Sequence, residues 1–354
     1  MRSLLFASAA LALIASPAHA FNAGVILQFG NNNASGNSYQ QNPPGGIISQ
    51  ASGANSGVII SAGDNNFNQI QQKAARWSIN DAQQIQLGNG NVALTKQETT
   101  QGSGAGGYFS LGTACDQPWC PPLVIPHSFD IHTNDAWTVQ VGGVNFSYTY
   151  QRGGSGLGNK SGVLQVGWAN GNIVYQVGGS SQNTIQLGFL NGSVTGQFGH
   201  GNESETFQLG MLNGQITLQR GRNNDASTTQ VGLLNGAATV QRGRNNEADT
   251  VQVGVLNGAN TTQRGNNNEA STTQAGFLNA ADTDQVGDDN HASTSQYGAF
   301  NKAGTSQAGD NNWSTVVQVG RGNDTQVAQQ DDSNWAAVGQ VGNDNTASIR
   351  QSNW

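Results

Sequence analysis

The residues that usually build a globular domain are scarce in this sequence. Charged residues make up 10% and apolar residues 35% of its 354 positions, where ordinary domains have about a quarter and about half. The scarcity of apolar side chains excludes a large hydrophobic core. The formal net charge is −7, which offers no attraction to nucleic acid or anionic lipid, so neither is expected as a partner.

Cysteine is nearly absent, and the two that are present lie close together. Cys115 and Cys120 are the first and last residues of the segment CDQPWC. In an oxidising compartment they are a possible disulfide that closes a small local loop. A metal site that adds His127 or His132 is the weaker interpretation, because no second Cys/His pair stands at a ligand spacing. We therefore expect no metal and no cofactor.

Long hydrophobic runs are also absent, with one exception at the start. Residues 1–20 combine Arg2, an apolar run from Leu4 to Ala15 and a small-residue cleavage pattern at Ala18 to Ala20. This arrangement predicts a secretory signal peptide that is too short to span a membrane. We expect an exported mature protein that begins at Phe21 and has no membrane span.

What the sequence does contain is a repeat with a period of eleven. Glycine contributes 49 residues, and the unit reads Q-x-G-x-x-N-x-A-x-x-x-Q. Gln recurs at every eleventh position from Gln186 to Gln351, in fifteen equal steps. A disordered chain has no reason to keep such a register. A right-handed coiled coil also has an eleven-residue period, but the Gly and Asn in each unit and the missing apolar seam exclude it.

The columns of the repeat indicate which way each side chain points. Twelve consecutive units, from Thr184 to Thr305, carry Thr two residues before Gln. The residue four before Gln is nearly always small, while the positions three and one before Gln vary. Because strand side chains alternate between faces, the constant positions share one face. We expect small residues, Thr, Gln and Gly to line a thin interior and the variable residues to meet solvent.

Asn five residues after Gln marks a turn, since Asn tolerates left-handed backbone. A strand of about six residues and a turn of about five make half a coil, and two halves make a 22-residue rung. The predicted fold is therefore all-β: a β-solenoid of 22-residue rungs, two 11-residue strand-turn units each, with amyloid-like cross-β stacking. Gln should stack on Gln and Asn on Asn in amide ladders, each amide donating to one neighbouring rung and accepting from the other.

The predicted ladder and turn residues are those at the constant positions of the repeat. The ladder glutamines are Gln186, Gln197, Gln208, Gln219, Gln230, Gln241, Gln252, Gln263, Gln274, Gln285, Gln296, Gln307, Gln318, Gln340 and Gln351. The ladder asparagines are Asn213, Asn224, Asn235, Asn246, Asn257, Asn268 and Asn279. The turn glycines are Gly210, Gly221, Gly232, Gly243, Gly254, Gly265 and Gly276.

The turns alternate between two kinds, which places each kind on its own edge of the solenoid. One set is apolar, as in Phe189-Leu190, and the other is polar, as in Arg222-Asn223. Either the leucines plug the corner of the solenoid, or they form a sticky edge for packing. Arg220 and its repeats at 242 and 264 recur beside acidic residues, of which Asp225 is the first. We interpret them as a neutralised surface ladder rather than an anion site.

The repeat divides the mature chain into two parts. Residues 134–354 form the regular solenoid. Residues 21–133 are Gly/Asn/Gln-rich and contain degenerate units, such as the one that begins at Gln86, together with loops marked by proline at 41–46 and 98–133.

The unit Q-x-G-x-x-N-x-A-x-x-x-Q over residues 134–354 resembles the curlin repeat of curli amyloid subunits. The resemblance implies a secreted structural subunit of an extracellular, cell-surface amyloid fibre that supports adhesion and biofilm matrix. It also implies self-association into a homopolymer, other curlin subunits as partners, and export through the periplasm by chaperones and an outer-membrane pore. In that family the repeat Gln and Asn are the ladder residues, here Gln230 and Asn235 and their equivalents.

Three other functions remain as alternatives. Catalysis has no support, because the five His are scattered and no nucleophile, metalloprotease or phosphate-loop motif is present. An ice-binding solenoid needs columns of Thr that point outward. Thr here lies two residues from Gln, on the same face of the strand, and is therefore expected to point inward. A monomeric β-solenoid adhesin or matrix protein that does not polymerise is the stronger alternative.

Overall fold

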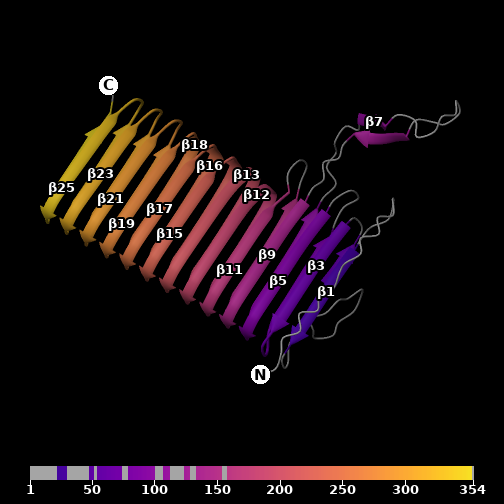
Figure 1. Ribbon diagram of the computed structural model, residues 1–354. Helices are drawn as coiled ribbons and strands as arrows, with labels where there is room; N and C mark the ends of the chain where they lie inside the picture. Colours follow the sequence, from indigo (N-terminus) through magenta and orange to yellow (C-terminus); the bar gives the residue numbers. More distant parts are fainter. Residues whose placement is uncertain are drawn as a thin grey trace.

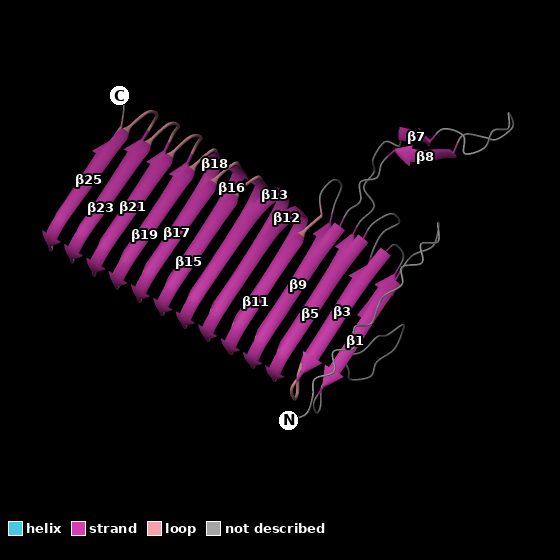
Figure 2. Ribbon diagram, viewed as in Figure 1, coloured by secondary structure: helices cyan, strands magenta, loops and turns pink. Residues whose placement is uncertain are grey.

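The structure is a parallel β-solenoid. The computed structural model describes residues 22–29, 48–51, 54–73, 79–99, 107–111, 123–127, 133–153 and 158–352. In these residues there is no helix, and the strands form two layers joined by tight turns (Figures 1 and 2). β1 and β25 lie at opposite ends of the row of strands (Figure 1). The predicted all-β solenoid of 22-residue rungs is confirmed.

Each rung contributes one strand to each of two faces, which we call face A and face B. Face A consists of β2 (Ile48–Ala51), β4 (Phe67–Lys73), β6 (Val92–Thr99), β10 (Phe146–Gly153), the first halves of β12 (Gly171–Phe189) and β13 (Gly192–Met211), β14 (Gly214–Arg222), β16 (Gly236–Arg244), β18 (Gly258–Asn266), β20 (Ala280–Val286), β22 (Lys302–Ala308), β24 (Asp324–Gln330) and β26 (Thr346–Gln351).

Face B consists of β1 (Asn22–Phe29), β3 (Ala54–Ala62), β5 (Ile79–Asn89), β9 (Thr133–Gly143), β11 (Lys160–Trp168), the second halves of β12 and β13, β15 (Asp225–Leu233), β17 (Glu247–Val255), β19 (Glu269–Phe277), β21 (His291–Ala299), β23 (Trp313–Arg321) and β25 (Trp335–Asn343). A separate antiparallel pair consists of β7 (Gly107–Leu111) and β8 (Leu123–His127).

Neighbouring rungs pair in parallel and in register, so that identical residues stack. In the β15–β17 pair, Gln230 lies beside Gln252 and Gly232 beside Gly254. The strands are longer than the six residues expected from the sequence: β15 has nine, and only Leu234 and Asn235 separate it from β16. The turn is this short because positive φ angles at Gly232 (127°) and Leu234 (57°) reverse the chain within a few residues.

The solenoid is continuous across the long insertion in the N-terminal third. β5 pairs in register with β9, and β6 with β10, although residues 100–132 separate the two rungs in the sequence. The insertion leaves the solenoid after β6 and rejoins it at β9, so the rungs on either side stack directly on each other. The signal peptide at 1–20 lies outside the described residues.

The turn glycines are required by the close stacking of the rungs. A Cβ atom built on Gly232 would lie 1.9 Å from the carbonyl oxygen of Gly254 in the next rung, and its φ of 127° is one that L-residues rarely adopt. Both constraints recur along the column. Gly236, at the start of the next strand, is different, because a Cβ there meets nothing within 4 Å.

We expect Gly232→Ala to destabilise the solenoid by more than about 1 kcal/mol, because the new methyl group meets backbone in a strained conformation. Gly236→Ala is the matched control and should leave stability unchanged or slightly raised. Denaturant unfolding of the two variants and the parent chain measures the difference. Equal effects of the two substitutions would contradict this role of the glycine column.

Candidate functional site

The interior of the solenoid is organised by two continuous ladders of glutamine side chains. On face B, Gln208 Nε2 donates to Gln230 Oε1, and Gln230 Nε2 donates to Gln252 Oε1, each at 2.8 Å. The face B ladder runs through Gln86, Gln140, Gln165, Gln186, Gln208, Gln230, Gln252, Gln274, Gln296, Gln318 and Gln340. The face A ladder runs through Gln72, Gln97, Gln151, Gln176, Gln197, Gln219, Gln241, Gln263, Gln285, Gln307, Gln329 and Gln351.

Each glutamine also ties the two faces together. The second hydrogen of the Gln230 amide is donated across the interior to the carbonyl oxygen of Gly214 on face A, at 2.9 Å. Gln241 on face A reaches the carbonyl oxygen of Asp225 on face B, at 2.7 Å. The side-chain amide thus bonds along the stack and across it. Because the hydrogen bonds of its amide are satisfied, a fully buried glutamine can occupy a position where an ordinary domain has Leu or Phe.

Asparagine ladders run along both edges, and their donors point the opposite way. Asn235 Nδ2 donates to Asn213 Oδ1 in the preceding rung at 3.1 Å, and to the carbonyl oxygen of Gly254 in the next rung at 3.0 Å. Asn235 Oδ1 accepts the backbone N–H of Asn257 at 3.2 Å. In the bonds between side chains, glutamine therefore donates to the next rung and asparagine to the preceding one.

The structure places the sequence-predicted glutamines and asparagines of residues 186–351 on these ladders, and the predicted glycines at the ends of strands with positive φ. It also adds earlier members, from Gln72 and Gln86 onwards, which the even eleven-residue count missed. The steps there are 21, 25 or 54 residues, as between Gln165 and Gln186, between Gln72 and Gln97, or between Gln86 and Gln140. The complete unit that begins at Gln86 is the sequence signal for this continuation. Cys115 and Cys120 lie outside the described residues.

The threonine columns are buried, as predicted, but several of their hydroxyls are not used. Within the described ranges, the Oγ1 atoms of Thr206, Thr228 and Thr239 are buried and have no hydrogen-bond partner. Val316 occupies the same column as Thr206 and Thr228 in a later rung and is also fully buried. The column therefore needs a small β-branched shape, and the hydroxyl is dispensable at these positions.

Two substitutions on one strand should have opposite effects. Gln230→Leu should destabilise the solenoid by about 1–3 kcal/mol, because one hydrogen of the Gln208 amide loses its acceptor and Gln252 Oε1 loses its ladder donor in a buried site. Thr228→Val, two residues away on the same inward face, should be neutral or stabilising because it removes an unsatisfied hydroxyl. Chemical denaturation of both variants gives the comparison. A Gln230→Leu variant as stable as the parent would refute the role of the ladder.

The leucines of the apolar turns do not plug the corners of the solenoid. Leu234 is 43% exposed and Leu278 is 37% exposed, with φ values of 57° and 53°. A leucine in left-handed backbone is unusual, and the opposite edge has Asn or Asp at the equivalent place, as at Asn245. The apolar edge is therefore an exposed ridge. Its turn pairs are Phe189–Leu190, Met211–Leu212, Leu233–Leu234, Val255–Leu256 and Phe277–Leu278.

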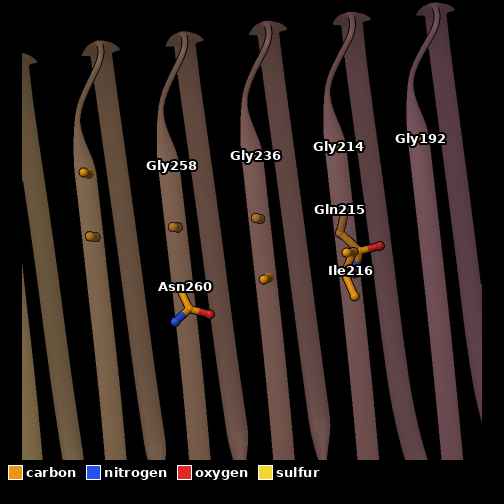
Figure 3. A pocket seen from close by; sticks show the side chains of 12 residues that line it. Gly192, Gly214, Gln215, Ile216, Gly236, Gly258 and Asn260 are labelled. Carbon is orange, nitrogen blue, oxygen red and sulfur yellow. The ribbon is translucent and has the colours of Figure 1, made fainter.

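A shallow groove runs beside this ridge on face A, at the start of the strands (Figure 3). Its floor is formed by Gly192, Gly214, Gly236 and Gly258. A Cβ atom at any of these glycines would meet nothing within 4 Å, so the groove is open at these positions. The side chains along it are short, apart from Gln215, Ile216 and Asn260 (Figure 3). The side chains that line the groove include no acidic, basic or nucleophilic group.

A strip of carboxylates lies on the outer surface of face B. Burial, together with the charges of Glu203, Glu247, Asp249 and Glu205, raises the pKa of Asp225 from 3.8 to about 6. The pKa values of Glu247 and Asp249 are also raised, first by burial and then by neighbouring carboxylates.

The predicted neutralisation of this strip by the arginine column is wrong. Among the described residues, the ion pairs within 4.0 Å join Lys96 to Glu98 and His291 to Glu269, and none includes Arg220 or its repeats. The arginines lie at the end of face A strands, whereas the acidic residues begin face B strands beyond the turn. The two charge columns therefore face different sides of the molecule.

The raised pKa of Asp225 predicts the direction of a pH effect. Its folded-state pKa of about 6 lies above the ordinary value of 3.8, so the fold binds the proton more tightly than the unfolded chain does. This contribution to stability is complete below pH about 4 and is lost as the pH rises through about 6. Denaturant unfolding between pH 4 and 7 should show it, and Asp225→Asn should flatten the profile. A steeper fall in Asp225→Asn than in the parent would contradict the assignment.

No group of three or more His, Cys, Asp or Glu that could hold a metal ion is found in the described part of the chain. None of its residues forms a helix long and apolar enough to cross a membrane.

Comparison with known proteins adds the family to this geometry. Residues 265–298, 301–330 and 329–352 match the model of the curlin associated repeat. No curated protein matches the chain. The matched residues contain the same Gln and Asn ladders, the same turn glycines and the same 22-residue register as the preceding rungs. Curlin repeats form structural rather than catalytic proteins, and residues 265–352 of this chain contain three matches to them.

Proposed function

We propose that the exported chain is a secreted structural subunit of an extracellular, curli-like amyloid fibre that grows rung on rung and supports adhesion and biofilm matrix. Its main partner is a second copy of itself. Other curlin subunits, an outer-membrane pore and chaperones are the further partners that the family resemblance suggests.

The observation that carries this proposal is the in-register stacking of identical ladder residues, which continues to the last described rung. In the described residues, β25 and β26 pair with β23 and β24 on one side and with no strand on the other. Gln340 and Gln351 accept from the preceding glutamines at 2.9 Å, and no later rung in the described residues accepts an amide hydrogen from either. A parallel strand with its ladder residues in place is a template on which the matching strand of another copy can stack in register.

The interior composition at the two ends supports end-to-end assembly. The middle rungs have Thr columns, but the last rungs contain an apolar cluster of Val316, Val327 and Val338, against which Ile349 packs. The first described rungs also contain an apolar cluster, built on Ile26 and Ile59 and joined by Ile70 and Ala82. Joining the end of one molecule to the start of the next would remove from water the partly buried Ile349 and Ile26, which pack against the two clusters; such burial is favourable at about 25 cal/mol per Å².

Seeded growth of the chain that begins at Phe21 tests the proposal. Ile349→Lys places a charge in the apolar end of the last rung, and we expect it to slow elongation from parent seeds by about tenfold or more. Val341→Lys is the matched control: it adds the same charge in the same rung, but at an outer position that is 80% exposed. Thioflavin fluorescence and electron microscopy follow the reaction.

A parent chain that stayed monomeric and did not seed would overturn the proposal and favour the monomeric adhesin. Equal elongation by Ile349→Lys and Val341→Lys would show that growth does not occur at this end.

A further inference from the structure

We propose that two copies of this chain pair side by side, with their rungs running in opposite directions, through the face A margin of the polar edge. We define the polar edge as the six turns that contain Arg222, Arg244, Asn266, Asp288, Asp310 and Asp332, together with the residues beside them.

The charges on this edge fall into two blocks of opposite sign. In three consecutive rungs, every charged residue at the end of the face A strand and in the following turn is an arginine. These are Arg220, Arg222, Arg242, Arg244 and Arg264. The next three rungs contain only aspartates there: Asp288, Asp289, Asp310, Asp331 and Asp332. Apart from half-buried Asp288, these side chains are exposed. Five positive charges are therefore followed along the stack by five negative charges.

A reversed second copy matches both blocks at once, whereas a copy in the same direction can match only one block, and only if it is shifted by three rungs. A two-fold axis between the Asn266 and Asp288 rungs would place Arg244 opposite Asp310 of the other copy and Arg222 opposite Asp332. The rung of Arg264 would then face that of Asp288. Pairing in the same direction would instead set arginine against arginine and aspartate against aspartate. The charge pattern thus specifies antiparallel pairs and disfavours parallel ones.

Within one molecule, like charges stack in both blocks. The rungs lie about 4.8 Å apart, so arginines repeat along the columns of Arg220 and Arg222, and aspartates along the column of Asp288, Asp310 and Asp332, which is unfavourable. The acidic residues beyond the turn begin the face B strands, and none is within ion-pair distance of these arginines among the described residues. An antiparallel neighbour relieves the repulsion in both blocks at once.

The aspartates are also held in position on the edge. Asp288 Oδ1 accepts the backbone N–H of Asn266 at 2.7 Å, and Asp310 Oδ1 accepts that of Asp288 at 2.7 Å. Asp332 Oδ1 accepts the N–H of Asp310 at 2.8 Å. Carboxylates fixed by backbone lose little side-chain freedom when a guanidinium approaches them. Single exposed pairs are weak, but the rigid stack presents all of them together.

The pairing concerns the sides of the solenoid and is independent of growth at its ends. In a chain that does not polymerise it produces a dimer, and in a fibre it produces paired filaments. Loss of pairing with intact seeding would reject this inference alone, and dimers without seeding would reject the fibre proposal alone.

Charge exchange within the column provides the test, because the column itself already contains both residue types. Arg222→Asp with Arg244→Asp would place aspartate opposite Asp332 and Asp310 of the paired copy, and Asp310→Arg with Asp332→Arg would place arginine opposite Arg244 and Arg222. The variant with all four substitutions exchanges the signs at these four positions but keeps the composition and net charge of the parent. Sedimentation of freshly diluted protein at 20 and 500 mM NaCl measures dimers, and electron microscopy measures the fraction of paired filaments.

The parent should pair at 20 mM NaCl and lose pairing at 500 mM, where the Debye length is only a few ångströms. Each double variant should bind itself about tenfold more weakly or worse, a mixture of the two should pair, and the fourfold variant should pair like the parent. Circular dichroism of the parent, the two double variants and the fourfold variant, recorded before any seeds are added, checks that all four proteins fold. Equal pairing by every variant, or no pairing by the parent at low salt, would overturn the inference.

Discussion

A buried side-chain amide must have its hydrogen bonds satisfied, and this requirement governs the whole structure. The amide of Gln230 is fully buried and donates both along the stack and across it. It can do so only if another glutamine lies one rung away and a carbonyl lies opposite. The exact stacking of rungs, the parallel register and the narrow interior all follow from this need, because a shift of one residue would leave every amide in a ladder unsatisfied at once.

The same requirement explains the extreme composition. A ladder interior replaces large apolar side chains with amides, small residues and threonine, so the chain can fold with few Leu, Ile or Phe. Apolar residues are then free to appear outside, as in the exposed ridge of Leu234 and its repeats. Towards the two ends of the described solenoid, valine and isoleucine occupy the threonine columns beside the glutamine positions, in the clusters around Val327 and Ile59.

Surface and interior have separate roles in this architecture. The interior repeats with little change from rung to rung, whereas the outer positions vary in blocks: arginine, then aspartate on one edge, and a carboxylate strip on face B. Such variation has no effect on the ladders, because strand side chains alternate between faces. A solenoid therefore allows one surface to be altered for packing between molecules while the template for stacking is preserved.

The sequence by itself determined the period, the inward face and the identity of the ladder residues. Side chains on a strand alternate between two faces, so the positions that stay constant in the eleven-residue repeat must be the ones that share the inward face. It also indicated two distinct edges. Only the tertiary structure decided the nine-residue strands with tight turns, the outward position of the leucines and the separation of Arg220 from Asp225, since each depends on how the turn directs its side chains. The continuity from Gln86 to Gln140 likewise required the fold, because a 54-residue step is visible as one rung only when the two strands stack.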